Sequence, residues 1–302
     1  MFFTNSDIVI YAKRVKETPR LISEELRGWR WSEPPVLPPS NTSLGVSDIT
    51  GGLCPNGRMV YLRYVKKVKE PFSPELARGS LIHEVYAGSI ETIKKIIYEE
   101  GKIDGNKLRS LASDFFSEFF KELEKKYSKV PDYAEVAKTV WDYSVNIYAS
   151  EVEKARARSP FLSKDSLVSL VVPFYVEYPI DGSLVGLSQN LRADALIPQI
   201  PIIAEMKTRK LKEVYDLALA GYALAYESVY YTPVDFGLLC NVVVKGGSVL
   251  VKCDFKKISD RLRQEFLEER DRRLEIIEKG VDPGLPKQCE PDCPFLNYCR
   301  LK

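Results

Sequence analysis

Two carboxylates and a lysine lie close together in the middle of the chain, in the stretch "LRADALIPQIPIIAEMKTRK". Asp194 belongs to one apolar segment, and Glu205 and Lys207 belong to the next. Because side chains alternate along a strand, Glu205 and Lys207 should share a face, and pairing of the two segments brings Asp194 towards Glu205. Mg²⁺ and Mn²⁺ prefer oxygen ligands. The stretch therefore indicates a metal site, with a solvated strand edge as the alternative.

Such a site has the residue types that phosphodiester hydrolysis needs. A divalent cation neutralises charge on the phosphate and lowers the pKa of an attacking water, and a lysine can orient that water or stabilise the transition state. His83, in "RGSLIHEVY", offers an imidazole that binds Mn²⁺ without adding charge. Tyr222 follows Lys207 by fifteen residues on an apolar helical segment. For His83 and Tyr222 the alternative is an ordinary structural side chain.

The chain ends "KQCEPDCPFLNYCRLK", in which three cysteines are potential metal ligands: Cys289, Cys293 and Cys299. A metal or cubane cluster held only by thiolates needs four. Cys54 lies in the turn "GGLCPNG", whereas Cys240 and Cys253 lie in strand patterns, where cysteine behaves as a small hydrophobic residue. Cys54 is therefore the favoured fourth ligand. Four thiolates serve zinc as well as an iron–sulfur cluster.

Charge and hydropathy narrow the class of protein. The 44 basic and 42 acidic residues nearly cancel, so bulk charge does not indicate a nucleic-acid partner. The N-terminus lacks a secretory signal and no segment approaches the ~18 apolar residues of a membrane span, so we expect a cytoplasmic protein without a membrane partner. Thiols stay reduced there, which favours metal ligation. A composition rich in Lys and Glu with one histidine is typical of thermophilic proteins. Because intracellular disulfides occur in hyperthermophiles, disulfides remain the alternative to metal ligation.

The pattern of apolar residues predicts an α/β fold in which a helical layer precedes a mixed sheet. The first fifty residues appear irregular and proline-rich. We expect four regions: an N-terminal segment with the first cysteine (1–79), a helical region (80–160), a sheet-containing core (161–280) and a cysteine tail (281–302). The expected helices are 81–101, 107–127, 132–158, 211–231 and 259–280. The expected strands are 167–180, 184–197, 202–210, 236–247 and 248–257.

In their order along the chain, these residues resemble a known family. His83, Asp194, Glu205-x-Lys207 and a tyrosine on the following helix look like the RecB-type branch of the P-D-(D/E)-x-K nucleases. One upstream cysteine and three at the C-terminus resemble the CRISPR-associated Cas-four exonucleases. The early "GGLCPNGRMVYLRYV" and the length look closest to the longer archaeal branch called Csa-one. The resemblance runs roughly from Val46 to the end.

The resemblance implies a restriction-endonuclease-like (RecB) core and a structural 4Fe–4S cluster that clasps both ends of the chain. The implied cluster ligands are Cys54, Cys289, Cys293 and Cys299. It also implies a metal-dependent exonuclease that prefers single-stranded DNA and prepares DNA for CRISPR spacer acquisition beside the integrase proteins. The implied ligands of Mn²⁺ or Mg²⁺ are His83, Asp194, Glu205 and the Met206 carbonyl. Lys207 is the implied catalytic lysine, with Tyr222 in the same catalytic set.

The sequence departs from the family pattern at two positions. Ala218 stands where a glutamine usually precedes the helix tyrosine by four residues, and the tail has Cys-x₃-Cys-x₅-Cys spacing where Cys-x₂-Cys is commoner. Ala218 keeps open a second hypothesis, a catalytically weak DNA-binding or scaffold subunit of a spacer-capture complex. A RecB-like DNA-repair nuclease is a further alternative.

Overall fold

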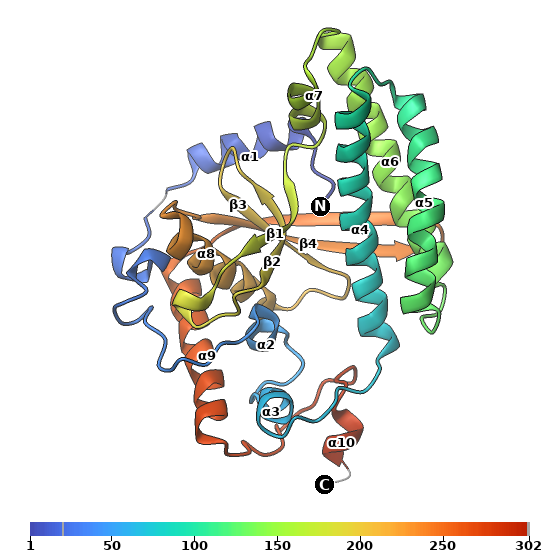
Figure 1. The fold of residues 1–302 in the computed structure, drawn as a ribbon. Helices are drawn as coiled ribbons and strands as arrows, with labels where there is room; N and C mark the ends of the chain where they lie inside the picture. The colour runs from blue at the N-terminus through green and yellow to red at the C-terminus, as the bar shows by residue number, and fades with distance from the viewer. Residues whose placement is uncertain (20, 301–302) are drawn as a thin grey trace.

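A five-stranded mixed sheet forms the centre of the protein in the computed structural model, which describes residues 1–19 and 21–300 (Figure 1). The strand order is β1-β2-β3-β4-β5; β3 and β4 are parallel and the other pairs are antiparallel. The strands are β1 (Tyr175–Ile180), β2 (Leu191–Ile197), β3 (Ile202–Lys207), β4 (Phe236–Lys245) and β5 (Ser248–Lys257). Helix α8 (Asp216–Tyr230) makes the crossover that the parallel pair requires. The predicted α/β class and mixed sheet are confirmed.

Helices cover both faces of this sheet and bury a separate core on each. On one side α4 (Pro74–Glu100), α5 (Gly105–Tyr127) and α6 (Tyr133–Arg158) pack together, and on the other α8 packs with α9 (Asp260–Lys279) (Figure 1). Helix α4 begins earlier than predicted, because the Ser73 hydroxyl caps it by accepting the backbone N–H of Leu76. None of the helices in the described part of the chain is long and apolar enough to cross a bilayer.

The remaining elements are short. They are α1 (Asn5–Glu17), η1 (Glu24–Leu26), η2 (Gly28–Arg30), α2 (Val46–Thr50), α3 (Arg58–Val60), η3 (Tyr61–Val65), α7 (Lys164–Val171), η4 (Ser183–Val185), η5 (Glu213–Tyr215) and α10 (Leu296–Arg300).

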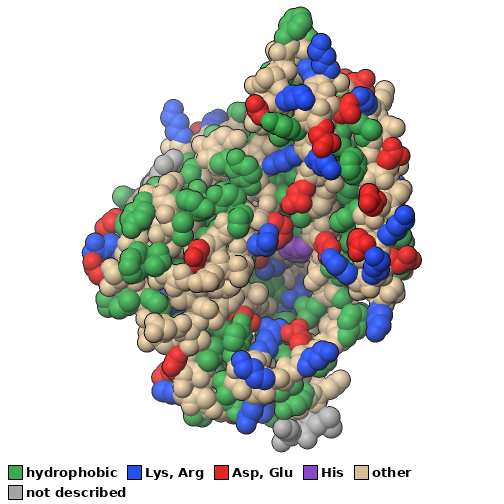
Figure 2. All heavy atoms as spheres, viewed as in Figure 1, with side chains coloured by type: hydrophobic (Ala, Val, Ile, Leu, Met, Phe, Trp, Pro, Cys, Tyr) green, Lys and Arg blue, Asp and Glu red, His purple; other side chains and the backbone are tan. Residues whose placement is uncertain are grey.

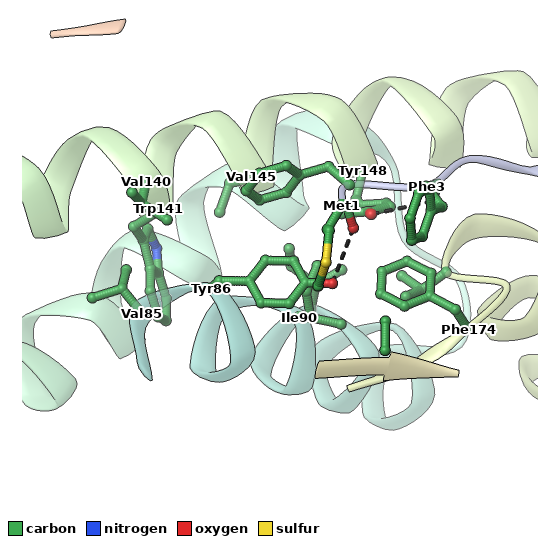
Figure 3. Close-up of a cluster of buried hydrophobic side chains, with 14 of the residues drawn as sticks. Met1, Phe3, Val85, Tyr86, Ile90, Val140, Trp141, Val145, Tyr148 and Phe174 are labelled. Atoms are coloured by element: carbon green, nitrogen blue, oxygen red, sulfur yellow. Dashed lines mark hydrogen bonds between the residues drawn. The ribbon is translucent and has the colours of Figure 1, made fainter. Parts of the chain in front are cut away.

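The prediction of an irregular N-terminus was wrong for α1. Asp7 accepts hydrogen bonds from the backbone N–H and the hydroxyl of Thr4 and so starts the helix. The residues before α1 enter the helical core, where the Tyr86 hydroxyl donates to the Met1 carbonyl (2.9 Å) and the Tyr148 hydroxyl donates to the Phe3 carbonyl (3.2 Å) (Figure 3). The aromatic core, which lies far along the chain, therefore fixes this segment.

The predicted strand at 167–180 was also partly wrong, because its first half is the helix α7. Ser163 caps α7 by accepting the N–H of Ser166, and Leu167 and Val171 are buried at a spacing of four residues. An apolar run of this length fits a strand or a buried helix, and here the cap and the contact with α4 and α6 decide for the helix.

A disulfide joins Cys240 on β4 to Cys253 on β5. The two residues are direct partners in the antiparallel ladder, with their Cα atoms 4.0 Å apart. The prediction that they act as independent small hydrophobic residues was therefore wrong, and neither is available as a ligand of the C-terminal cysteines. Only the pairing of the two strands brings the sulfur atoms together.

Loss of this disulfide should destabilise the sheet without affecting the other cysteines. For a cross-link between residues 13 positions apart, the chain-entropy model gives about 3 kcal/mol of unfolding free energy. We expect a Cys240→Ala/Cys253→Ala variant to unfold at a lower urea concentration, with its free energy of unfolding reduced by about 3 kcal/mol. Wild type in reductant should match the variant. Equal stability of oxidised wild type and variant would show that the disulfide does not contribute.

Buried charges fix α8 and α9 against the N-terminal segment. Glu227 on α8 accepts two hydrogen bonds from Arg263 on α9 (both 2.8 Å) and one from Arg27 (2.9 Å), and Arg27 also bonds Asp235 (2.6 Å). Glu227 and Arg263 are fully buried. Removal of one partner would leave an uncompensated charge in the core, so the network holds α8 in one position over the sheet.

Candidate active site

A cavity of about 790 Å³ opens between α4 and the sheet. Its lining includes His83 on α4, Glu177 on β1, Arg192 on β2, and Glu205 and Lys207 on β3. In Figure 2 the chain's single histidine, in purple, lies within a hollow that basic side chains, in blue, partly surround. The structure thus brings the histidine of the helical layer to the charged residues of the sheet.

Asp194 connects the helical layer to β3. Its Oδ1 lies 3.0 Å from Nδ1 of His83, and its Oδ2 accepts the backbone N–H of Met206 at 2.6 Å. The N–H and C=O of one strand residue point to the same side, so the Met206 carbonyl also faces Asp194. Asp194 therefore contacts both His83 and the Met206 backbone, two of the residues that the resemblance implies as metal ligands.

Glu205 and Lys207 form an ion pair on one face of β3, as their alternation predicted. Lys207 Nζ lies 2.7 Å from Glu205 Oε1 and 5.0 Å from the centre of the Tyr215 ring. The other carboxylate oxygen of Glu205, Oε2, is buried and has no hydrogen-bond partner among the described residues. An unpartnered buried carboxylate oxygen is costly, and a bound cation would satisfy it.

The electrostatics of the cavity favour a bound cation. Burial raises the pKa of Glu205, and burial followed by the Asp194 charge raises the pKa of Glu177. Burial opposes the charge of Asp194, but His83, the Met206 N–H and Lys207 outweigh it and lower the pKa of Asp194. Burial likewise opposes a charged His83, yet the Asp194 carboxylate raises its pKa. The carboxylates together attract positive charge to this place.

Glu177 is a site residue that the sequence reasoning missed. Among the described residues, one group of potential ligand atoms lies within 4.8 Å of one another, and its members are His83, Glu177 and Asp194. Glu205 lies in the same cavity but outside that group. These donors suit a divalent cation, since carboxylate oxygens and an imidazole are common ligands of Mn²⁺.

A break in the β1–β2 ladder turns Glu177 into the site. Val176 pairs with Ala195 and Tyr178 pairs with Ala193, whereas Glu177, opposite Asp194, has a φ of +46°. Val176 packs in the core beneath α4–α6, but Tyr178 packs in the core beneath α8, so the strand turns over at Glu177. A non-glycine residue at positive φ costs about 1–3 kcal/mol, and such strain gathers at functional sites. The sequence signal, one glutamate in "YVEYPI", was too weak to find it.

Tyr222 and Ala218 lie one helical turn apart on α8. Tyr222 packs against the core beneath α8, and burial, followed by the nearby Glu205, Asp194 and Glu177, raises its pKa well above the ordinary value. Ala218 is fully buried in the same core and offers no polar group to the site.

The four other cysteines gather where the two ends of the chain meet, with α3 and α10 side by side (Figure 1). Cys54, Cys293 and Cys299 belong to one apolar cluster with Phe295. Burial raises the pKa of the Cys293 and Cys299 thiols, and the neighbouring cysteines, Cys289 and Cys54 among them, raise both further. The predicted set is therefore brought together by the fold.

Two buried arginines lie beside these cysteines. Arg58 forms a bidentate pair with Asp282 (3.0 and 2.9 Å) and also interacts with the Cys299 sulfur. Arg273 donates to the Cys54 carbonyl (3.2 Å), and among the described residues its Nε and Nη1 have no partner. A thiolate-bound group carries negative charge, which these donors suit.

Ion pairs connect the cysteine tail to the loop that leaves the candidate site. Arg209 bonds Asp292 (2.8 Å), and Lys212 bonds Glu290 (2.8 Å). Asn241 on β4 donates to the carbonyls of Lys207 (2.9 Å) and Arg209 (2.8 Å). The tail therefore braces the segment immediately after the lysine of the candidate site.

Comparison with known proteins identifies the family of this chain. A family model described as "CRISPR-associated exonuclease Csa1" matches residues 1–301, so the likeness extends to the N-terminal segment as well. A protein of that name from Saccharolobus solfataricus is 48% identical over 299 residues, 99% of each chain. One from Thermoproteus tenax is 29% identical over 287 residues, 95% of each. The chain belongs to the CRISPR-associated exonuclease Csa1 family.

Proposed function

We propose that this protein is a metal-dependent DNA exonuclease with a structural 4Fe–4S cluster. The observation that carries the proposal is the convergence of His83, Glu177 and Asp194 within 4.8 Å, beside the Glu205–Lys207 pair in one cavity. The relatives named as exonucleases support the reaction class.

The residues of the cavity have different proposed roles in phosphodiester hydrolysis. His83, Asp194, Glu205 and the Met206 carbonyl are the proposed ligands of Mn²⁺ or Mg²⁺, joined by Glu177. The cation supplies charge neutralisation on the phosphate and a lowered pKa for water. Lys207, held by Glu205 and the Tyr215 ring, orients the attacking water and stabilises the developing charge. Tyr222 limits solvent access from the α8 side.

The proposed substrate is DNA with an accessible single-stranded end, and the proposed setting is CRISPR spacer acquisition with integrase proteins as partners. The relatives' names, which include "CRISPR-associated exonuclease", support the setting. Manganese-dependent resection of end-labelled single-stranded DNA tests the activity. A duplex of the same sequence is the control for strand preference, and absence of cleavage with every divalent cation tried would contradict the proposal.

The proposed cluster ligands are Cys54, Cys289, Cys293 and Cys299. Support comes from the mutual proximity of these cysteines and from the unpartnered donors of Arg273 beside Cys54. An anaerobic absorption spectrum, with iron, sulfide and zinc measured on the same sample, tests the assignment. A band near ~400 nm with about four irons per chain is expected, and a single zinc would contradict it.

Glu177→Gln should weaken the binding of Mn²⁺. The substitution keeps the shape but removes one negative charge from the three-ligand group. Loss of one carboxylate ligand is expected to raise the Mn²⁺ concentration for half-maximal resection by about tenfold or more. Titration of Mn²⁺ against the resection rate measures the effect, and exposed Glu122→Gln on α5 is the matched control. An unchanged titration would exclude Glu177 as a ligand.

A catalytically weak DNA-binding or scaffold subunit is the second candidate function. The observation in its favour is Ala218, which replaces a polar family residue by a buried apolar one beside Tyr222. DNA binding without resection by the wild-type protein would favour this candidate.

A further inference from the structure

Five tyrosines of α8 and β1 lie on one side of the sheet, towards the outer end of α8. Tyr222, Tyr226 and Tyr230 recur every four residues and so lie along one face of α8. Tyr175 and Tyr178 come from β1, against which this helix packs. We call these five residues the tyrosine strip.

Four rings of the strip, those of Tyr175, Tyr178, Tyr226 and Tyr230, contact one another. The centres of Tyr226 and Tyr230 lie 4.5 Å apart, and Tyr178 lies 6.3 Å from Tyr226 and 6.2 Å from Tyr230. The Tyr178 hydroxyl donates to that of Tyr230 at 3.2 Å. Tyr175 continues the row at 5.7 Å from Tyr178. Mutual contact holds the rings in place, so little side-chain entropy remains to be lost when a ligand binds.

The outer part of the strip lies at the surface. Tyr175 is 49% exposed and Tyr230 is 42% exposed, because β1 is an edge strand and Tyr230 ends its helix. The inner part begins beside Glu177, which lines the cavity, although Tyr178 itself packs in the core beneath α8. The strip therefore starts one residue along β1 from the cavity where cleavage is proposed.

Basic side chains flank the strip. Lys94 Nζ lies 4.9 Å from the centre of the Tyr175 ring, and the Lys94 ammonium donates to the Phe174 carbonyl. At the other end of β1, exposed Arg192 pairs across the ladder with Pro179 and lines the cavity. Aromatic rings between two cations match a strand that carries bases between phosphates.

We propose that the tyrosine strip is a base-stacking platform for single-stranded DNA beside the candidate active site. The inference rests on the proposed function and extends it to the recognition of the substrate. Every base has a π-face, so stacking on tyrosine binds a single strand without regard to sequence. A duplex hides these faces between its base pairs, so the strip favours single strands.

The test compares two fluorescent oligonucleotides of equal length, one of thymidines and one of abasic sites, in the Lys207→Ala background so that neither is cut. Both carry the same phosphates, and only the first can stack. We expect Tyr175→Ala/Tyr230→Ala to lower the affinity for the thymidine oligonucleotide by about tenfold or more and to leave that for the abasic one unchanged. Tyr230→Phe, which keeps the ring, should bind like the parent.

Phe161→Ala is the matched control, because this aromatic side chain is 95% exposed outside the strip. Equal losses of affinity for both oligonucleotides, or no loss of affinity for either, would overturn the proposal. If neither affinity changes, a protein partner is the better occupant of the strip. These experiments distinguish failure of the strip proposal from failure of the proposed function. Resection by wild type with no base-dependent loss would refute only the strip, whereas base-dependent binding without any resection would refute only the nuclease.

Discussion

Replacement of Lys207 by alanine is expected to slow Mn²⁺-dependent resection of single-stranded DNA by at least about 100-fold. Lys207 is the ammonium group that the structure places against Glu205 inside the cavity. A group that acts mainly on the transition state lowers kcat with little change in KM, so single-turnover rates at saturating DNA are the measurement. Lys252→Ala, which removes a 79% exposed lysine from β5, is the control.

The same variant separates the two candidate functions. Lys207→Ala also leaves Glu205 buried without its cation, so thermal unfolding must show that the variant still folds. A folded variant with the wild-type rate would remove Lys207 from the mechanism. If neither wild type nor variant resects while both bind DNA equally, the scaffold hypothesis is correct.

Replacement of Cys54 by serine should remove the cluster and much of the stability. Cys54 and Cys289 are 235 positions apart, so the proposed cluster closes a very long loop. For a cross-link over such a loop the chain-entropy model gives about 5 kcal/mol of unfolding free energy. We expect Cys54→Ser to lose its iron and the absorption near ~400 nm and to unfold at markedly lower temperature, because ligation and folding are coupled.

The disulfide provides a matched control for this experiment. Cys240→Ser/Cys253→Ser removes two cysteines that are bonded to each other, so its iron content should equal that of wild type. If Cys54→Ser kept its iron and its melting temperature, Cys54 would not be the fourth ligand. Because Arg209 and Lys212 bind the tail, loss of the cluster should also increase proteolysis of the loop after β3.

The sequence by itself determined the local part of this architecture. Helical periodicity and glycine breaks predict α4–α6, and period-two alternation places Glu205 and Lys207 on one face of β3. The approach of Asp194 follows from a short connection between two strands. These features depend on residues close in the chain, where backbone geometry leaves few choices, and so a pattern was enough to find them.

The tertiary structure alone decided the features that depend on distant segments. Glu177 enters the site because β1 changes the face that it presents at the break in its ladder with β2. Regular two-residue alternation would instead place Val176 and Tyr178 on the same face of the sheet and Glu177 on the other. Cys240 and Cys253 bond because the β4–β5 register places them opposite each other. The position of the segment before α1 and the tyrosine strip likewise depend on which surfaces pack together. Packing of this kind depends on the free energy of the whole fold, which local periodicity does not contain.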